Sequence, residues 1–148
     1  VLGKGDQTVR IASEALPNVV YGGFVPPEDL PAHLLAADIL INPRPSDADF
    51  ASNSFPSKLL EYASTGRPVL TTRIASIPEA LRPCFHYIDE ESPAGIVRAI
   101  QALAALPEAE RVAHARRSRE TVIAECSEEA IARSLAAFLE TASPGEVR

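Results

Sequence analysis

The sequence lacks several features that mark other classes of protein. It has no tryptophan and no methionine, and aromatic residues make up only 5% of its 148 residues. None of its apolar runs approaches the roughly 18 residues that a membrane-spanning helix needs. The best candidate, residues 34–41, is short and is interrupted by Asp38. A charged segment followed by an apolar one is also missing at the start, so nothing in the sequence predicts export.

Positive charge and cysteine are scarce as well. The net charge is −6 and the pI is about 5.1, so the chain lacks the excess of positive charge that is typical of a nucleic-acid-binding protein. Cys84 and Cys126 lie far apart and fit neither a CxxC redox pair nor a zinc-binding pattern. We therefore expect no nucleic-acid partner, no metal, and two free thiols in a reducing cytoplasm.

What remains is the composition of an ordinary folded domain. Hydrophobic residues make up 46% and charged residues 23%, and 148 residues are enough to bury a real core. The missing methionine and the apolar, strand-like start at Val1-Leu2 favour a segment from within a longer protein. We expect residues 1–148 to form a single domain whose fold is incomplete at its N-terminal edge.

Short apolar runs alternate with helical patterns along the chain. The sequence predicts strands at 1–2, 19–24, 38–42, 68–72 and 85–88, and helices at 7–15, 28–36, 55–65, 92–103, 108–124 and 128–141. This alternation indicates an α/β fold, a doubly wound parallel sheet with helices on both faces and further helices at the C-terminus. Gly66 suits a left-handed helix end and Ser127 an N-cap. The last helix is predicted to bury a stripe formed by Ile131, Leu135, Phe138 and Leu139.

One loop stands out as a ligand site. Ligands of such folds bind beyond the carboxyl ends of the strands, which selects the loops 3–6, 23–26 and 43–56. The last of these is long, polar and proline-rich, and leads into a helix whose predicted first turn is Phe55, Pro56, Ser57 and Lys58. Free first-turn amides, the Ser57 hydroxyl and the helix dipole together predict an anion site. Glu61 lies roughly 7 Å further along the axis, where its carboxylate suits a vicinal diol.

Three segments carry a resemblance to a known family. They are Val19-x-Tyr21-x-Gly23-x-Val25, residues 37–43 (ADILINP), and residues 55–69 (FPSKLLEYA-x-x-G-x-PV). In order and spacing they resemble the C-terminal domain of retaining GT-B glycosyltransferases, the large group-1 family. Residues 1–148 would then form a single Rossmann-like donor-binding domain, one half of a GT-B fold, that lacks its first strand–helix segment.

The resemblance implies a ligand and a role for several residues. The donor would be a nucleotide-diphosphate sugar, with no cofactor and no metal required. Residues 55–58 would hold its diphosphate, Glu61 its ribose hydroxyls, and the backbone around Phe24 and Val25 its base. Gly3, in a glycine-containing turn after a strand, is a further candidate for nucleotide contact, although such a turn can also be purely structural. The acceptor, a glycan, a lipid or a small molecule, would bind to an N-terminal domain that these residues do not contain.

Two departures from the family pattern affect the expected activity. The family often has a donor-sugar-binding glutamate eight residues before the ribose-binding one, and Asn53 stands there in this chain. Asn53 is thus the candidate sugar contact, and no catalytic residue is assigned. The family's basic pair, which neutralises the leaving diphosphate, belongs to a segment before Val1. We expect a hexosyl-transferring enzyme of polysaccharide biosynthesis as the full-length protein, and an inactive isolated chain.

Several alternatives stay open at this point. The chain could be a regulatory nucleotide-binding module, or part of a GT-B-fold epimerase or phosphorylase, because fold alone does not fix chemistry. Glu61 could lie on a solvated helix face, and Lys58 could pair with it instead of facing a phosphate. The Asp47-Ala48-Asp49 triplet has the form of the metal-binding DxD motif of a different glycosyltransferase fold, but in so polar a loop it is interpreted as solvated. A basic stretch is interpreted as a solvated face, with peripheral contact at the inner face of the membrane as the alternative; its residues are Arg111, His114, Arg116, Arg117 and Arg119.

Overall fold

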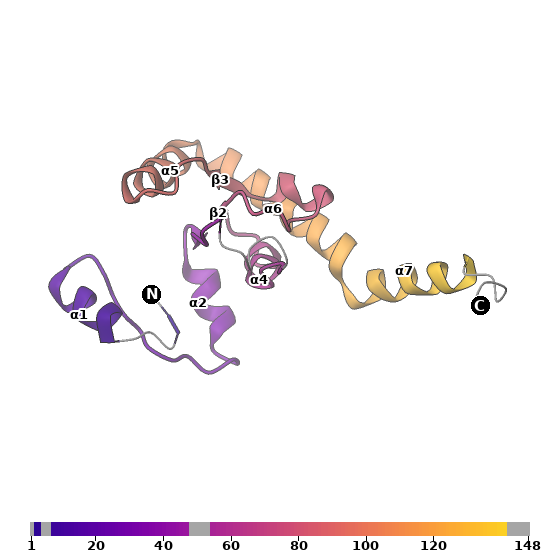
Figure 1. Cartoon of the computed structure of the whole chain (residues 1–148), viewed down its shortest axis with the longest axis horizontal. Coiled ribbons are helices and arrows are strands. Elements are labelled where there is room, and N and C mark those ends of the chain that lie inside the picture. The colour runs from indigo at the N-terminus through magenta and orange to yellow at the C-terminus, as the bar shows by residue number, and fades with distance from the viewer. Residues whose placement is uncertain (1, 4–6, 48–53, 142–148) are drawn as a thin grey trace. The chain divides into compact units, whose positions relative to one another are not determined.

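The computed structural model describes residues 2–3, 7–47 and 54–141 (Figure 1). The chain divides into two units, Val1–Ala36 and Ala37–Arg148, and each is described by itself. Both contain helices, but the described strands lie in the second unit. The α/β fold predicted from the sequence is confirmed there.

The first unit contains helix α1, Gln7–Ala15, with the predicted bounds, and helix α2, Leu30–Ala36. In place of the strand predicted at 19–24, the described residues have a single parallel bridge between Leu2 and Gly23. Val1, the first residue of the strand predicted at 1–2, lies outside the described residues. The prediction of a strand over 19–24 was therefore wrong for the described residues. A strand needs a neighbour that pairs its backbone groups along its length, and here one bridge provides that pairing.

The second unit is built on a parallel three-stranded sheet in the order β1-β2-β3. Its strands are β1, Leu40–Asn42, β2, Val69–Thr72, and β3, His86–Ile88. All four residues of β2 are buried, as expected for the central strand of a sheet covered on both faces. These strands fall inside three of the predicted apolar runs.

Helices cover both faces of this sheet. Helix α4, Lys58–Ser64, packs on β1 and β2, and helix α5, Pro93–Ala105, packs on β3 from the other side (Figure 1). On the α5 face, Leu70, Ile88 and Leu103 form a buried apolar cluster. Helix α6, Glu108–Cys126, then packs on α4 and on η1, a 3-10 helix at Glu79–Cys84 that the sequence patterns did not reveal.

Local end signals in the sequence are reproduced in this unit. Gly66, just after α4, has φ +73°, the left-handed conformation predicted for it. The Ser127 hydroxyl accepts a hydrogen bond of 3.2 Å from the Ala130 N–H at the start of α7, Glu128–Thr141. Ser92 caps α5 in the same way, through a 3.1 Å bond from the Gly95 N–H.

The predicted buried stripe of the last helix is contradicted. The four apolar side chains of α7 are 56–66% exposed. Helix α7 packs mainly on α6, and no other described helix or strand packs closely enough to cover its apolar face. The periodicity was correctly recognised as an amphipathic helix, but amphipathicity says nothing about which surface is available to bury it. These side chains are Ile131, Leu135, Phe138 and Leu139.

Candidate functional site

The start of α4 is shaped by Pro56 and Ser57. The Leu59 N–H donates to the Pro56 carbonyl at 2.9 Å, and the Leu60 N–H to the Ser57 carbonyl at 3.0 Å. The α-helix therefore begins at Lys58 and not at Phe55, three residues later than predicted. Ser57 has helical torsion angles, φ −53° and ψ −30°, and its hydroxyl makes no capping hydrogen bond.

Helix α4 presents polar residues on one face and buries the other. Leu59 and Ala63 have no exposed surface, whereas Ser57, Lys58 and Glu61 are exposed. Ser57 and Glu61 are four residues apart, and the Glu61 N–H donates to the Ser57 carbonyl at 3.3 Å, so they share a face. Among the described side chains, Lys58 and Glu61 form no ion pair with each other.

The charge of Glu61 acts on its neighbour. Burial raises the pKa of the Tyr62 hydroxyl above its ordinary value, and the Glu61 carboxylate raises it further. Tyr62 is half-buried and stays neutral at physiological pH, so Glu61 and Lys58 are the charged groups at the start of this helix. One positive and one negative group, both exposed, lie within the first turn.

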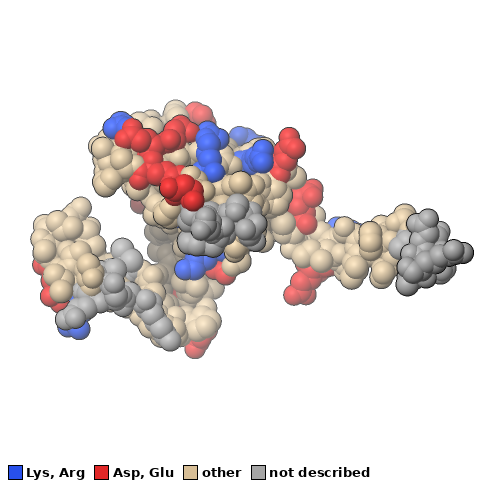
Figure 2. All heavy atoms as spheres, in the orientation of Figure 1, with Lys and Arg blue, Asp and Glu red and all other residues tan. Residues whose placement is uncertain are grey.

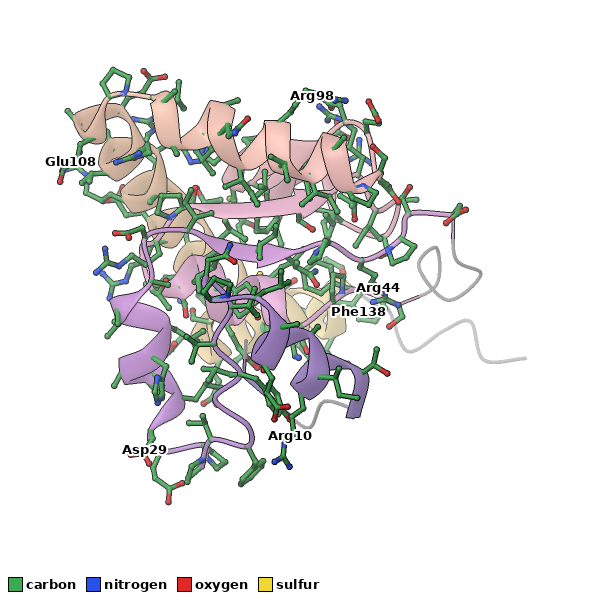
Figure 3. All side chains as sticks on the ribbon, turned by 90° about the vertical axis from the view of Figure 1, so that its left-hand side faces the viewer. Arg10, Asp29, Arg44, Arg98, Glu108 and Phe138 are labelled. Carbon is green, nitrogen blue, oxygen red and sulfur yellow. The ribbon has the colours of Figure 1, made fainter. Side chains whose placement is uncertain are left out.

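The ends of the loop before α4 are held by side chains that sequence reasoning missed. Arg44, which lies beyond the end of β1 (Figure 3), donates to the Ser54 carbonyl at 3.3 Å, and Ser76 donates to the same carbonyl at 3.2 Å. The Ser46 N–H donates to Glu91 at 3.0 Å, and the Thr72 hydroxyl donates to the Arg44 carbonyl. These partners are 10 to 45 residues apart in sequence, so no local pattern could reveal them.

The remaining candidate residues belong to the first unit or lie outside the described residues. Gly3 has φ +123°; its N–H donates to Gly23 at 2.8 Å, and its carbonyl accepts from the Tyr21 hydroxyl at 2.8 Å. Both backbone groups of Gly3 are thus bonded to residues near position 22 within the first unit. Phe24 is 64% exposed and Val25 is half-buried. Asn53, like Lys4, Gly5 and residues 48–49, lies outside the described residues.

The basic stretch of α6 is engaged in contacts with the protein. Arg111 donates to the Ala104 carbonyl at 2.6 Å, Arg119 donates to the Ser64 carbonyl at 2.9 Å, and Arg116 lies 3.9 Å from Glu120. On the face shown in Figure 2, acidic and basic side chains are mixed. These three residues of the basic stretch are thus in contact with other residues of the second unit.

Two other kinds of site are absent from the described part of the chain. No cluster of three His, Cys, Asp or Glu side chains there could hold a metal ion. None of the helices described is long and apolar enough to cross a membrane.

Comparison with known proteins identifies the family. Residues 1–105 match the family described as glycosyl transferases group 1, and the chain belongs to that family. The chain is also 29% identical over 87 residues to a Bacillus subtilis (strain 168) protein provisionally named teichuronic acid biosynthesis glycosyltransferase TuaH. That alignment covers 58% of this chain and 22% of the relative, so the chain spans only a small part of the relative's length.

Proposed function

We propose that this chain binds the nucleotide-diphosphate sugar donor of a retaining, hexosyl-transferring glycosyltransferase. The observation that carries the proposal is the start of α4. It lies inside the family match, and it presents Ser57, Lys58 and Glu61 together, exposed and without an ion pair among the described side chains. Transfer itself would need the rest of the protein, including the acceptor-binding domain. The name of the B. subtilis relative favours a role in polysaccharide synthesis.

The diphosphate would bind at Ser57 and Lys58. Their N–H groups have no carbonyl partner among the described residues, because the first hydrogen bonds of the helix start at Leu59. The Ser57 hydroxyl, not used in capping, adds a donor, and the Lys58 ammonium adds a full positive charge. Donors fixed before the reaction would stabilise the negative charge that develops on the departing diphosphate.

The ribose would bind to Glu61. Four residues of helix separate it from Ser57, roughly 6 Å along the axis, which is the span from a diphosphate to the ribose hydroxyls. A carboxylate accepts two hydrogen bonds at once and so suits a vicinal diol. Contacts of Phe24 and Val25 with the base, of Gly3 with the nucleotide and of Asn53 with the sugar remain predictions from the family resemblance.

Calorimetry with a ribonucleoside diphosphate and its 2′-deoxy analogue tests this assignment, with both UDP and GDP as probes. Hydrogen bonds to a charged group contribute about 1.5–3 kcal/mol, so the ribose form should bind roughly tenfold to a hundredfold more tightly. Glu61→Ala should weaken binding of the ribose form and remove most of the preference. Glu61→Asp should do nearly the same, because its carboxylate is one methylene short.

A matched control and a double-mutant cycle make the result decisive. Glu129→Ala changes an equally exposed helix glutamate on α7 and should leave the ribose preference unchanged. The cycle pairs the Glu61 side chain with the 2′-hydroxyl and separates their coupling from general loosening of the site. A coupling near zero in a variant that melts like the wild type would show that Glu61 is only a surface glutamate.

A further inference from the structure

A pocket lies between the segment that follows β2, helix η1 and strand β3. It has a volume of about 240 Å³ and is lined by Arg73, Ile74, Ala75, Arg82 and Tyr87. Arg73 directly follows β2, and Tyr87 lies within β3. Arg73 thus lies at the carboxyl end of β2, the side of a parallel sheet at which ligands bind, and none of the five residues belongs to the site proposed at α4.

The two arginines of the pocket are each fixed through one nitrogen. Arg73 Nε lies 3.0 Å from an Asp89 carboxylate oxygen, and its guanidinium carbon lies 4.3 Å from the centre of the Tyr87 ring. Arg82 Nε donates to the Ile77 carbonyl at 3.4 Å, and the Tyr87 hydroxyl donates to the Arg82 carbonyl at 2.9 Å. For both arginines, the terminal Nη groups have no partner among the described residues.

This arrangement concentrates positive charge around one ring. Burial raises the pKa of the Tyr87 hydroxyl, while the nearby positive charges of Arg73 and Arg82 lower it, so both guanidinium groups lie within electrostatic reach of Tyr87. The pocket lining contains no carboxylate, and Asp89 offsets only one of the two charges. An oxyanion in the pocket would meet two oriented guanidinium forks, the geometry that binds carboxylate and phosphate groups in a bidentate manner.

The pocket is also connected to the segment that enters α4. Ser76, one residue beyond the lining residue Ala75, donates a hydrogen bond of 3.2 Å to the Ser54 carbonyl. The 73–77 segment and the entry to α4 are thus in direct contact within the second unit. We propose that Arg73, Arg82 and Tyr87 form an oxyanion subsite that binds the carboxylate or phosphate group of an acidic sugar. The sugar part rests on the proposed function, whereas the anion part does not.

Nuclear magnetic resonance titration of the isotope-labelled 148-residue chain tests the proposal. The probes are glucuronate, glucose 6-phosphate, inorganic phosphate and neutral glucose, all at constant ionic strength. Glucuronate or glucose 6-phosphate should shift the amide signals of residues 73–75, 82 and 87 saturably, and glucose should not. A preference for glucuronate assigns the subsite to carboxylates, and a preference for glucose 6-phosphate assigns it to phosphates.

Single substitutions locate the binding charge. Arg73→Gln and Arg82→Gln should each weaken binding of the preferred probe about tenfold. Arg116→Gln is the matched control, since it removes the same charge from a similarly exposed ion pair, and should change the affinity less than twofold. Arg73 and Arg82 are both exposed, so the two variants should melt like the wild type. If one of them does not, the affinity of the other variant decides the test.

Three results would overturn the proposal. One is the absence of saturable shifts at these residues with any anion, and another is an equal loss of affinity in Arg116→Gln. Inorganic phosphate that binds as tightly as both sugar probes would overturn the sugar part and leave a small-anion site. Measuring UDP and GDP affinity in the same samples keeps the two sites separate, because loss of the nucleotide site leaves the signals of residues 73–87 responsive to anions.

Discussion

The two units of this chain contain similar local patterns and bury them very differently. In Ala37–Arg148, side chains from Leu40 to Val122 form the buried core, and several of them have almost no exposed surface. In Val1–Ala36, none of the side chains described is fully buried, although α1 is strongly amphipathic and α2 contains Leu30, Leu34 and Leu35. Local periodicity therefore forms helices in both units. Burial also requires a partner surface, and among the described residues the second unit alone supplies one.

The largest expected effect sets Leu59 against Leu35. Leu59 of α4 has no exposed surface, and Leu35 of α2 is 49% exposed. Leu59→Ala should lower the free energy of unfolding by about 2–5 kcal/mol, because it removes buried methyl groups and leaves a cavity. Leu35→Ala should cost less than about 0.5 kcal/mol. Urea denaturation measures both; equal losses would mean that the first unit is buried in solution as well as the second.

An intermediate effect should appear on acidification and should come from the second unit. Burial lowers the pKa of His86 from 6.5 to about 4, and the nearby His114 makes a smaller contribution in the same direction. The rings of His86 and His114 lie 4.2 Å apart, and His86 Nε2 is buried without a described hydrogen-bond partner. Above pH 6.5 His86 is neutral in both the folded and the unfolded state, so it does not lower the free energy of unfolding. Between pH 6.5 and 4 the unfolded state takes up the proton first, and the free energy of unfolding falls.

The loss should be about 1–2 kcal/mol, because His86 is only half-buried and solvent reduces the effect. Denaturation of the wild type and of His86→Gln at pH 7.5 and 4.5 isolates it from the carboxylates, which titrate in both proteins. His33→Gln, at an exposed position of the first unit, is the matched control and should keep the wild-type difference. If His86→Gln loses as much stability on acidification as the wild type, His86 does not contribute.

The smallest expected effect compares two glycines in the same conformation. Gly66 has φ +73° and Gly23 has φ +67°, and a Cβ would meet the Arg119 side chain at 3.4 Å only at Gly66. Gly66→Ala should lower the free energy of unfolding of the core by about 1 kcal/mol through left-handed strain. Gly23→Ala carries similar strain in the first unit and should leave the core transition within about 0.3 kcal/mol. Equal shifts of that transition would show that the two units unfold together.

Much of the secondary structure could be predicted, and the errors share a cause. Helix α1 and helix α7 have their predicted bounds, and Gly66 and Ser127 end and begin helices as expected. These signals depend on residues within one or two turns of each other. The strand at 19–24 and the buried stripe of α7 were wrong because both depend on neighbours that the described chain does not place there.

The candidate site divides along the same line. The α4 stretch and its family resemblance are contiguous in sequence, so residues 55–61 and the group-1 family could be recognised from the order of residues alone, and the family is confirmed. The pairing of Arg44 with Ser54, and of Ser46 with Glu91, could not. The pocket of Arg73, Arg82 and Tyr87 could not be predicted either, because nothing in the sequence around these residues distinguishes them from ordinary surface residues.

The sequence by itself determined the positions of most helices, the helix ends marked by Gly66 and Ser127, the apolar runs of the sheet and the family. Propensity, capping and periodicity act over a few residues and can therefore be recognised locally. The tertiary structure alone decided which apolar faces are buried and which arginines face a common pocket. Those properties depend on contacts between residues far apart in the chain, such as Arg73 with Asp89 and Ser76 with Ser54. They form only when packing of the parallel strands brings the loops at their carboxyl ends together.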